Sequence, residues 1–306
     1  LSYFYSNYQR EKAIPYLEDA LKYSTKDTIP EIYYYLAKAY HFNGDYQKSE
    51  RAYALFVPKI KVNTLAGRKL VTNVKNLNRY NKNAAILKRT KHKITIKNIG
   101  AGINTSEQEY APVIKDSTTL LFTSRRKSIT NKLAADLMPY EDIYLAKFKN
   151  NHWVLENNEL NSGEYMPPHI NTKKHDAAII YSKDGKTFYS YKKNKIWYST
   201  FENGKWTTLK LLDQEINGTG IRVPSTSLTA DQEKMFFVTA EKKGFGGKDI
   251  YMSKRLKNGK WSEPTNLGDI INTPEDEDAP YLSPDGKTLY FSSKGHDGIG
   301  GYDIYK

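Results

Sequence analysis

The sequence predicts a multidomain α + β protein, in which an N-terminal α-helical segment precedes an all-β region built from repeated four-stranded units. Two observations support this prediction. Small and apolar residues recur with helical spacing through the first sixty positions, whereas short aromatic and β-branched runs broken by Gly, Asn and Asp begin near Lys93. Three separate markers then repeat with a period near 54 residues. A chain of 306 residues is long enough for each part to bury a core of its own.

Composition excludes several classes of protein. The chain contains no Cys, which excludes a disulfide framework, a thiolate metal site and a thiol nucleophile. Its mean hydropathy of −0.71 argues against a membrane-spanning helix. The net charge is +13, but thirteen Lys and Arg residues and no acid lie between Arg51 and Ser106, and the remainder has 34 residues of each sign. Because the excess charge is confined to one segment, we expect no nucleic-acid partner.

The segment 1–60 has the residue pattern of paired helices. One set of residues recurs after 36 positions, since Ala13, Leu17 and Ala20 return as Ser49, Tyr53 and Phe56. Between the two sets, an aromatic-rich stretch ends in a turn at Asn43-Gly44-Asp45-Tyr46. This pattern resembles the tetratricopeptide repeat, in which small residues lie where two helices touch. We therefore predict tetratricopeptide-like repeats at 1–60, and we expect missing chain or a docked neighbour because fewer than about three repeats are seldom stable.

The stretch 61–92 is predicted to be a basic helical linker or cap. Its apolar residues form a narrow stripe for one or two helices: Val62, Leu65, Leu70, Val74, Leu77 and Leu87. The densest run of positive charge consists of Lys88, Arg89, Lys91 and Lys93. We expect these four residues to bind an acidic protein or an anionic envelope surface. A solvated connector, and docking onto the chain's own acidic run at 275–278, remain open as alternatives.

Three markers repeat through residues 93–306 with spacings of 53 to 57 residues. The first marker is Asp142-Ile143-Tyr144, which returns as Lys195-Ile196-Trp197, Asp249-Ile250-Tyr251 and Asp303-Ile304-Tyr305. The second is Trp153, Trp206 and Trp261, and the third is Asn104, Asn161, Asn217 and Asn272. Asp-Gly and Asn-Gly pairs between the markers suit tight hairpins, because both residues tolerate positive φ. Four short strands in each period predict a β-propeller at 93–306, with about four blades and an incomplete ring.

Several strings in this region resemble the WD40-like, TolB-type propeller repeats of Bacteroidota cell-envelope proteins. They are E-Y-A-P with T-S-R-R in 109–126, N-L-G-D-I-I-N-T at 266–273, G-F-G-G-K-D-I-Y at 244–251 and G-I-G-G-Y-D-I-Y at 298–305. The order of helical repeats and propeller is similar to that of envelope proteins of the OmpA family, in which a peptidoglycan-binding OmpA-like domain often follows. We expect the remaining blades, and any such domain, to lie outside this chain.

The resemblance also implies a location and a role. Related proteins are exported periplasmic components associated with the outer membrane, and some are linked to type IX secretion and gliding motility. It therefore implies a non-enzymatic scaffold that binds other envelope proteins, such as an outer-membrane protein or a lipoprotein complex, and reaches peptidoglycan through a domain absent here. The alternative from another class is a carbohydrate-binding or ligand-binding propeller, in which exposed Tyr and Trp rings would stack on sugars.

Individual residues of the repeats are expected to be structural. Asp142, Asp249 and Asp303 recur in three units, and we expect each to accept hydrogen bonds from its own turn, because an active site is seldom built three times. The three Trp residues are expected to pack in the seams between neighbouring blades. Arg125 and Arg126 occur in one unit only. They are candidates for binding a carboxylate or phosphate of a partner, and the alternative is an ion pair at the rim.

No enzyme signature emerges from the sequence. There is no G-x-S-x-G nucleophile motif, and the six His residues lack metal-binding spacing. The Gly-rich loops precede a strand rather than a helix, so they are expected to be tight connections and not phosphate cradles. The acidic run at 275–278 lacks the alternating ligands of a calcium loop and is expected to be a solvated loop. We therefore predict no catalytic, metal or cofactor site.

Overall fold

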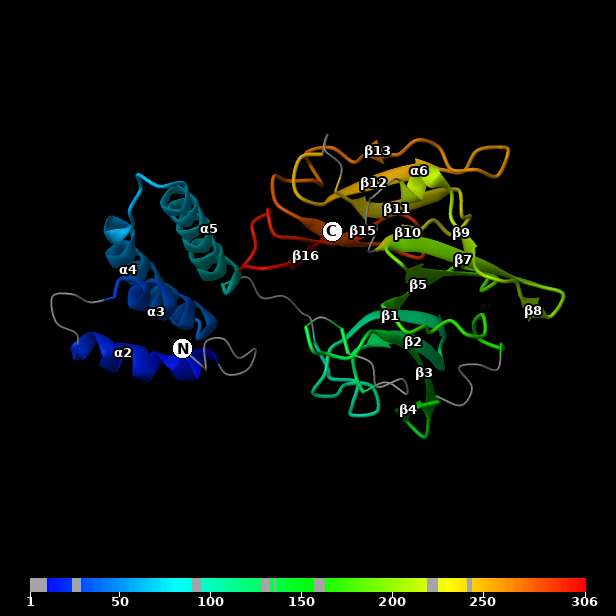
Figure 1. Ribbon diagram of the computed structural model, residues 1–306, viewed down its shortest axis with the longest axis horizontal. Helices are drawn as coiled ribbons and strands as arrows, with labels where there is room; N and C mark the ends of the chain where they lie inside the picture. The colour runs from blue at the N-terminus through cyan, green and yellow to red at the C-terminus, as the bar shows by residue number, and fades with distance from the viewer. Residues whose placement is uncertain are drawn as a thin grey trace. The chain divides into compact units, whose positions relative to one another are not determined.

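The computed structural model describes residues 10–23, 29–89, 95–127, 133–134, 136–156, 163–218, 225–240 and 244–306 (Figure 1). The chain divides into two compact units. The helical unit comprises residues 1–94 with 296–303, and the propeller unit comprises 95–295 with 304–306. An N-terminal helical segment followed by β-sheets in a propeller-blade arrangement is the fold that the sequence predicted.

The described helices of the helical unit follow one another closely along the chain. They are η1 (Arg10–Ala13), α2 (Ile14–Lys22), α3 (Glu31–Phe42), α4 (Tyr46–Phe56), η2 (Val57–Lys59) and α5 (Leu65–Leu87). A short turn joins α3 to α4, and Gly44 adopts a φ of 80° there, which a residue with a side chain rarely does. No helix in the described part of the chain is long and apolar enough to cross a bilayer.

The core of this unit is built from small and aromatic side chains on facing helices. Its buried members are Ala13, Leu17, Leu36, Ala37, Ala39, Tyr40, Ala52, Tyr53, Phe56 and Val74. Four of them, Ala13, Leu17, Tyr53 and Phe56, belong to the two sets of residues that recur in the sequence at a spacing of 36. The basic stretch forms a single helix, α5, whose residues Leu70, Val74 and Leu77 pack against this core. Helix pairs of this kind occur in several repeat families, so the tetratricopeptide assignment stays a prediction.

A buried polar contact joins three of these helices. The Nδ2 of Asn81 on α5 donates to Ser49 Oγ on α4 at 2.9 Å. The Oδ1 of Asn81 lies 2.7 Å from His41 Nδ1 on α3. Asn81 and Ser49 are both buried, and an unpaired amide would be costly at this position. The network therefore fixes the position of α5 against the α3–α4 pair.

The described residues of the propeller unit form four antiparallel sheets, each made of strands that follow one another in sequence. The first sheet holds β1 (Glu109–Asp116), β2 (Thr119–Ser124), β3 (Asp142–Lys149) and β4 (His152–Leu155). The second holds β5 (Asp176–Tyr181), β6 (Thr187–Lys192), β7 (Lys195–Glu202), β8 (Lys205–Trp206) and β9 (Lys210–Leu211), and the short α6 (Gln214–Asn217) follows it. The third holds β10 (Thr226–Leu228), β11 (Lys234–Thr239), β12 (Asp249–Lys254) and β13 (Thr265–Asn266). The fourth holds β14 (Glu277–Leu282), β15 (Leu289–Ser293) and β16 (Asp303–Tyr305).

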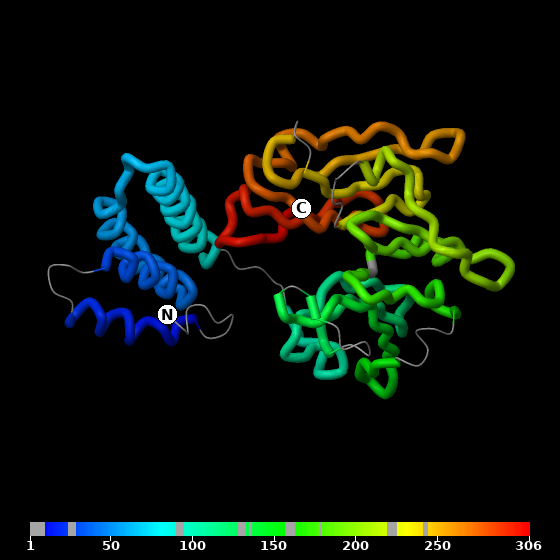
Figure 2. Tube along the Cα trace, in the orientation of Figure 1, coloured from blue at the N-terminus to red at the C-terminus, as the bar shows by residue number. Residues whose placement is uncertain are grey.

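Figure 2 traces this succession of sheets from green through orange to red. The hairpins use the turns that the sequence indicated. Asn203 and Gly204, for example, both have positive φ, 51° and 77°, between β7 and β8. Each Asp-Ile-Tyr marker, or its Lys-Ile-Trp equivalent, begins the third strand of its sheet. The sequence period therefore corresponds to one blade.

Hydrophobic seams join neighbouring sheets. The first seam contains Leu121 and Ile143 of the first sheet with Phe188 and Trp206 of the second. The second seam joins the second and third sheets through residues that include Tyr189, Ile196, Phe237 and Trp261. The third seam joins Val238 and Ile250 to Phe291 of the fourth sheet. Trp206 and Trp261 are buried in the first and second seams.

An asparagine clamp accompanies each seam. The side chain of Asn272 accepts from Ile250 N at 2.7 Å and donates to Ile250 O at 2.9 Å. Asn217 makes the same two bonds to Ile196, at 2.7 and 3.0 Å, and Asn171 makes them to Ile143, at 2.8 and 2.9 Å. A side-chain amide reproduces the donor and acceptor of a peptide group. Each Asn therefore pairs with both the backbone N–H and the backbone C=O of the Ile that follows the marker Asp or Lys. The clamp ties the loop that leads to the next blade to the third strand of the preceding blade.

Candidate partner-binding surface

The basic segment presents a stripe of positive charge on the helical unit. Three exposed residues of α5, Arg68, Lys75 and Lys82, are spaced by seven residues, and exposed Arg89 continues this spacing in the turn after the helix. Seven residues are about two helical turns, so the four side chains lie near one helix face at intervals of about 10 Å. Gly67, Val74 and Asn81, each one residue earlier in the chain, are buried and lie on the face of α5 that is directed toward the core of the helical unit. We call these four exposed residues the basic stripe.

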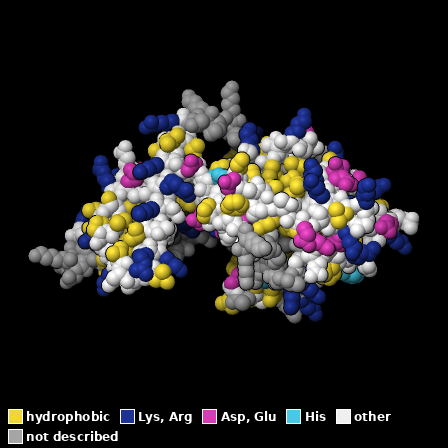
Figure 3. Space-filling view, turned by 90° about the horizontal axis from the view of Figure 1, so that it is seen from above, with side chains coloured by type: hydrophobic (Ala, Val, Ile, Leu, Met, Phe, Trp, Pro, Cys, Tyr) yellow, Lys and Arg dark blue, Asp and Glu magenta, His cyan; other side chains and the backbone are white. Residues whose placement is uncertain are grey.

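This charge has no acidic partner within the described residues. None of the ion pairs in that part of the chain involves a Lys or Arg between Arg51 and Arg89. In the space-filling view, dark blue Lys and Arg side chains predominate over magenta Asp and Glu on the visible face of the helical unit (Figure 3). Like charges held on a rigid helix raise the local potential, because they neither neutralise one another nor separate freely.

A groove of about 420 Å³ lies at one end of this surface. Its walls come from the α3–α4 turn with the start of α4 and from the end of α5: Gly44, Asp45, Tyr46, Gln47, Lys48, Ala85, Lys88 and Arg89. Lys88 Nζ lies 5.9 Å from the centre of the Tyr46 ring, and Lys48 Nζ lies 5.3 Å from the Tyr40 ring. The only carboxylate in the lining, Asp45, accepts a 2.9 Å hydrogen bond from Asn43 Nδ2.

The groove is suited to an acidic group. Three cations and the Tyr46 ring surround it, and the volume is within the range of small-ligand and side-chain pockets. Lys88 and Arg89, which the sequence analysis predicted to bind a partner, line this groove. Lys91 and Lys93 are outside the described residues. The sequence analysis missed Lys48 and Tyr46. Their turn was recognised, but nothing in the order of residues indicated that it lies beside the end of α5.

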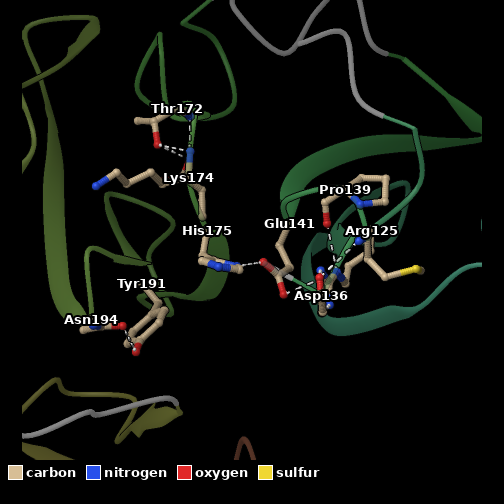
Figure 4. A network of polar contacts seen from close by, with 11 residues as sticks. Arg125, Asp136, Pro139, Glu141, Thr172, Lys174, His175, Tyr191 and Asn194 are labelled. Carbon is tan, nitrogen blue, oxygen red and sulfur yellow. Dashed lines mark hydrogen bonds and ion pairs between the residues drawn. The ribbon is translucent and has the colours of Figure 1, made fainter. Parts of the chain in front are cut away.

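The guanidinium of Arg125 forms its hydrogen bonds within the propeller unit (Figure 4). Its guanidinium donates two hydrogen bonds to Asp136, at 2.7 and 2.8 Å, and a third to Pro139 O at 2.9 Å. This bidentate bond from Arg125 lowers the pKa of Asp136 to about 2. Glu141 lies 3.8 Å from Arg125 Nε and also contacts Nδ1 of His175, which immediately precedes β5 of the second sheet. The Arg125 side chain thus supports the junction of the first two sheets.

Arg126 is also held inside its own sheet. It donates to Ser124 Oγ at 3.0 Å, to Ile103 O at 2.5 Å and to Glu109 at 3.2 Å. Its guanidinium lies about 5 Å from the centres of the Phe122 and Tyr144 rings, at 5.0 and 4.9 Å. A partner carboxylate would have to displace Glu109 to reach it. The geometry therefore gives neither arginine a free guanidinium for partner binding.

The acidic run at 275–278 is not the solvated loop expected from the sequence. Glu277 is fully buried and accepts from Thr273 N, Thr273 Oγ1 and Ser293 Oγ, each within 2.7 Å. Asp276 pairs with Lys294 at 2.7 Å, and Asp278 pairs with Lys248 at 2.9 Å. Because these carboxylates satisfy groups of the third and fourth sheets, they are not free to receive the basic segment. Among the described residues, no group of acids or His residues is arranged to hold a metal ion.

Two of the marker Asp residues accept hydrogen bonds from the backbone of the loop that precedes them. Asp249 accepts from Phe245 N at 2.6 Å and Gly246 N at 3.0 Å. Asp303 accepts from Ile299 N at 2.8 Å and Gly300 N at 3.0 Å. Asp142 is buried at the start of β3. Gly246 is required by crowding, since a Cβ there would lie 2.0 Å from Glu275 O. The Gly-rich loop is a close connection between sheets and leads into strand β12, not into a helix.

A second pocket lies between the second and third sheets. Its volume is about 330 Å³, and its lining is Thr187, Tyr189, Tyr198, Thr200, Asp231, Gln232, Glu233 and Arg255. Asp231 accepts from Thr229 Oγ1 and Glu233 N, and these bonds lower its pKa. Arg255 donates to Gln232 O at 3.2 Å and lies 4.6 Å from the Trp261 ring centre.

Comparison with known proteins finds weak likenesses among solved structures alone. No protein-family model matches the sequence, and no curated protein matches it. Among solved structures, TolB from Acinetobacter baumannii is 15% identical over 65% of this chain, with a TM-score of 0.37. An Agrobacterium tumefaciens protein assigned as TolB is 15% identical over 65% of the chain and 81% of its own length, with a TM-score of 0.36. The α-L-arabinofuranosidase from Lactobacillus brevis is 15% identical over 67% of the chain and 71% of its own length, with a TM-score of 0.36.

These likenesses are too weak to carry function. The matched part of the chain spans 40% of the Acinetobacter TolB. The neighbours include both TolB and a glycosidase, and one fold commonly supports unrelated activities. The propeller assignment therefore rests on the chain's own sheets, seams and repeated clamps.

Proposed function

We propose that this chain is a non-enzymatic scaffold of the bacterial cell envelope that binds an acidic protein partner through its helical unit. The observation that carries the proposal is the basic stripe beside the groove, whose cations have no acidic partner among the described residues. A surface of this kind accelerates encounter with an oppositely charged protein and orients it before close contact forms. The groove then offers Lys48, Lys88 and Arg89 to one acidic side chain or to a terminal carboxylate.

The propeller unit supports a scaffold role rather than catalysis. Its repeated aromatic residues are buried in seams, its marker Asp residues hold loops, and both Arg125 and Arg126 are bonded internally. These features explain the recurring residues by packing and hydrogen bonding, without assigning any of them to a reaction.

The finer assignment rests on the resemblance of the repeat strings. We place the protein at the periplasmic side of the outer membrane, with an outer-membrane protein or a lipoprotein complex as its partner. Type IX secretion or gliding motility is the machinery that this resemblance favours, and tetratricopeptide-like repeats would be the partner-binding element. A peptidoglycan-binding domain outside this chain would anchor the assembly.

Charge reversal tests the helical surface. In one variant, Lys48, Lys88 and Arg89 are each replaced by Glu. The matched control carries Lys257→Glu, Lys260→Glu and Lys287→Glu, three exposed lysines of the propeller unit, and has the same change in net charge. Each protein is immobilised and exposed to periplasmic and outer-membrane extracts at low and high salt, and captured proteins are identified by mass spectrometry.

We expect one acidic protein to be retained by the wild type and by the control variant at low salt, and to be lost from the groove variant. High salt should weaken capture by the wild type, because exposed charges are screened over about 10 Å at 0.1 M ionic strength. Equal capture by all three proteins, or loss with both variants alike, would contradict the proposal. Circular dichroism and the Tm confirm that the variants are folded.

A carbohydrate-binding propeller is the remaining candidate from another class. Exposed Tyr281 and Tyr290, whose ring centres are 6.3 Å apart on the fourth sheet, are the observation in its favour. Tyr281→Ala with Tyr290→Ala should abolish glycan-array binding if these rings stack on sugars. Retained protein capture in that double variant would separate the two candidates.

A further inference from the structure

The first sheet of the propeller unit holds a lysine ammonium between a hydroxyl and an aromatic ring. Thr119 begins β2 and is paired with Lys147 of β3. Lys147 Nζ donates to Thr119 Oγ1 at 3.0 Å and lies 3.7 Å from the centre of the Tyr165 ring. The hydroxyl accepts a hydrogen bond from the ammonium, and the ring attracts its charge. This position of the blade is therefore suited to a cation.

The second sheet has threonine where the first sheet has this lysine. Its strand pair places Thr187 of β6 opposite Thr200 of β7, as Thr119 is opposite Lys147. Thr200 and Lys147 each lie five residues after the first residue of their marker. In the third sheet the same position is occupied by Lys254. Among these three sheets as described, the second therefore lacks the lysine.

The pocket of about 330 Å³ between the second and third sheets lies at this position. Its lining contains Thr187 and Thr200, and also Asp231 and Glu233 from the turn between β10 and β11. Within the described part of the chain, the hydroxyls of Thr187 and Tyr198 and the carboxylate of Glu233 have no hydrogen-bond partner. The lining thus presents oxygen atoms that the folded chain does not use.

Arg255 contributes the positive charge of this lining, and its hydrogen bonds go to the backbone. Its Nε donates to Gln232 O at 3.2 Å, and its Nη1 donates to Gly259 O at 3.4 Å. Among the described residues, it forms no ion pair with Asp231 or Glu233. Two carboxylates and one guanidinium give the lining a net negative charge.

We propose that this pocket binds a primary alkylammonium group from outside the chain, in the place that Lys147 Nζ fills in the first sheet. The three N–H donors of an ammonium match the Thr187 hydroxyl and the carboxylates of Asp231 and Glu233. Its alkyl stem lies along the Tyr198 ring, as lysine stems lie on apolar surface elsewhere. Charge-assisted hydrogen bonds to two carboxylates favour this cation over a neutral or anionic ligand.

The ammonium group has two chemical sources. A free amine and a lysine side chain of another protein present the same three donors on the same kind of stem. The volume of the pocket suits either one, because it is in the range of small-ligand and side-chain pockets. The site lies in the propeller unit and does not depend on the groove of the helical unit, so each proposal is tested separately.

A ligand titration of the whole chain tests the pocket. The protein is labelled with nitrogen-15 and titrated with n-butylammonium, and the amide chemical shifts are followed by NMR. The control ligand is n-butanol, which keeps the alkyl stem and a hydrogen-bond donor but has no charge. The test variant is Glu233→Gln. Its matched control is Glu263→Gln, which removes the charge of another exposed glutamate of the propeller unit.

We expect n-butylammonium to cause saturable shifts around the pocket lining and n-butanol to cause none. Glu233→Gln should raise the Kd for n-butylammonium at least fivefold, and Glu263→Gln should leave it within twofold of the wild-type value. Equal binding of the two ligands, or equal effects of the two variants, would overturn the proposal.

A second variant supplies the ammonium from the chain itself. Thr200→Lys copies the pair of Thr119 and Lys147, so its side chain should occupy the pocket and abolish the shifts caused by n-butylammonium. Thr200→Ser keeps the hydroxyl and should bind as the wild type does. The Tm confirms that both variants are folded. Retained binding by folded Thr200→Lys would show that the ammonium does not lie opposite Thr187, and the proposal would be wrong.

A last titration distinguishes the two sources of the ammonium. Nα-acetyl-lysine methylamide presents the side chain as it occurs in a protein, whereas n-butylammonium is a free amine. Tighter binding of the lysine amide would support a lysine of a protein partner, and tighter binding of n-butylammonium would support a small molecule. Failure of both to bind the wild type would contradict the assignment of the pocket.

Discussion

The three repeated tryptophans differ in burial although they share one sequence position. Trp206 and Trp261 lie in seams with a sheet on each side. Trp153 packs beside Phe148, with ring centres 5.2 Å apart, and is only half-buried against the first sheet. The sequence marker therefore indicates a place in the blade, and the number of neighbouring sheets decides how much of the side chain is covered.

Truncation of these residues should follow their burial. We expect Trp206→Ala and Trp261→Ala each to lower the free energy of unfolding by about 3–5 kcal/mol, because a large apolar side chain leaves a cavity in a seam. Trp153→Ala should cost clearly less. Urea unfolding monitored by circular dichroism gives the three values, and an equal loss for Trp153 would contradict the seam argument.

A second effect of a single residue is the acidity of Asp136. The bidentate hydrogen bond from Arg125 holds its folded-state pKa at about 2, below the ordinary value of about 3.9 for an unfolded chain. Because the folded pKa is depressed, the stability from this ionised pair is fully present above about pH 4 and is lost as pH falls through about 2. Carbon-detected NMR titration should give that pKa.

The matched variant for this titration is Arg125→Met, which removes the donor and keeps the length of the side chain. In that protein the pKa of Asp136 should return toward the ordinary value. A titration of Asp136 near pH 4 in the wild type would show that the Arg125 contact does not form in solution.

Helix α5 shows how one element serves two roles. Its buried face holds Val74 and Asn81 against the helical core, while Arg68, Lys75, Lys82 and Arg89 follow one residue later in each heptad. The structural role depends on the polar contact of Asn81 with Ser49 and His41. Reversing charges on the exposed stripe should therefore leave the fold intact.

The Asn81 contact can be measured with a double-mutant cycle. Asn81→Ala removes the hydrogen-bond partner of buried Ser49 and of half-buried His41, and we expect it to lower the free energy of unfolding by about 1–3 kcal/mol. Ser49→Ala should cost less in the Asn81→Ala background than alone, because the bond between the two side chains has already been lost. Additive losses would mean that the two residues do not interact.

Ile250 and Ile304 occupy the same position of the repeat but differ in burial, so truncating each of them tests how the sheets of the propeller unit pack. Ile250→Ala should lower the free energy of unfolding by about 2–5 kcal/mol, since the side chain is fully buried in the third seam. Ile304→Ala should change it by no more than about 0.5 kcal/mol, because an exposed residue loses little on truncation. Equal losses for the two variants would mean that Ile304 is covered in solution.

Much of the fold was predictable because its determinants are local. Asn203-Gly204 and the Asp-Gly pairs prefer hairpin turns whatever surrounds them, and strands between such turns must alternate their side chains. The period of the markers then located every third strand, including β16. The helical segment was predictable for the same reason, since helical spacing is a property of consecutive residues. Repetition added the expectation that Asp249 and Asp303 hold their own loops.

The remaining features depend on contacts between segments that are distant in the chain. The groove forms because the turn at Tyr46 lies beside Lys88, and no local preference specifies that pairing. Arg125 is bonded to Asp136 and the acidic run is bonded across sheets, because burying a charge requires a partner that only the folded chain can supply. Ile304 has the same neighbours in sequence as Ile250. Its side chain is 81% exposed, against 0% for Ile250, so a repeat that predicts the strand does not predict what packs on it.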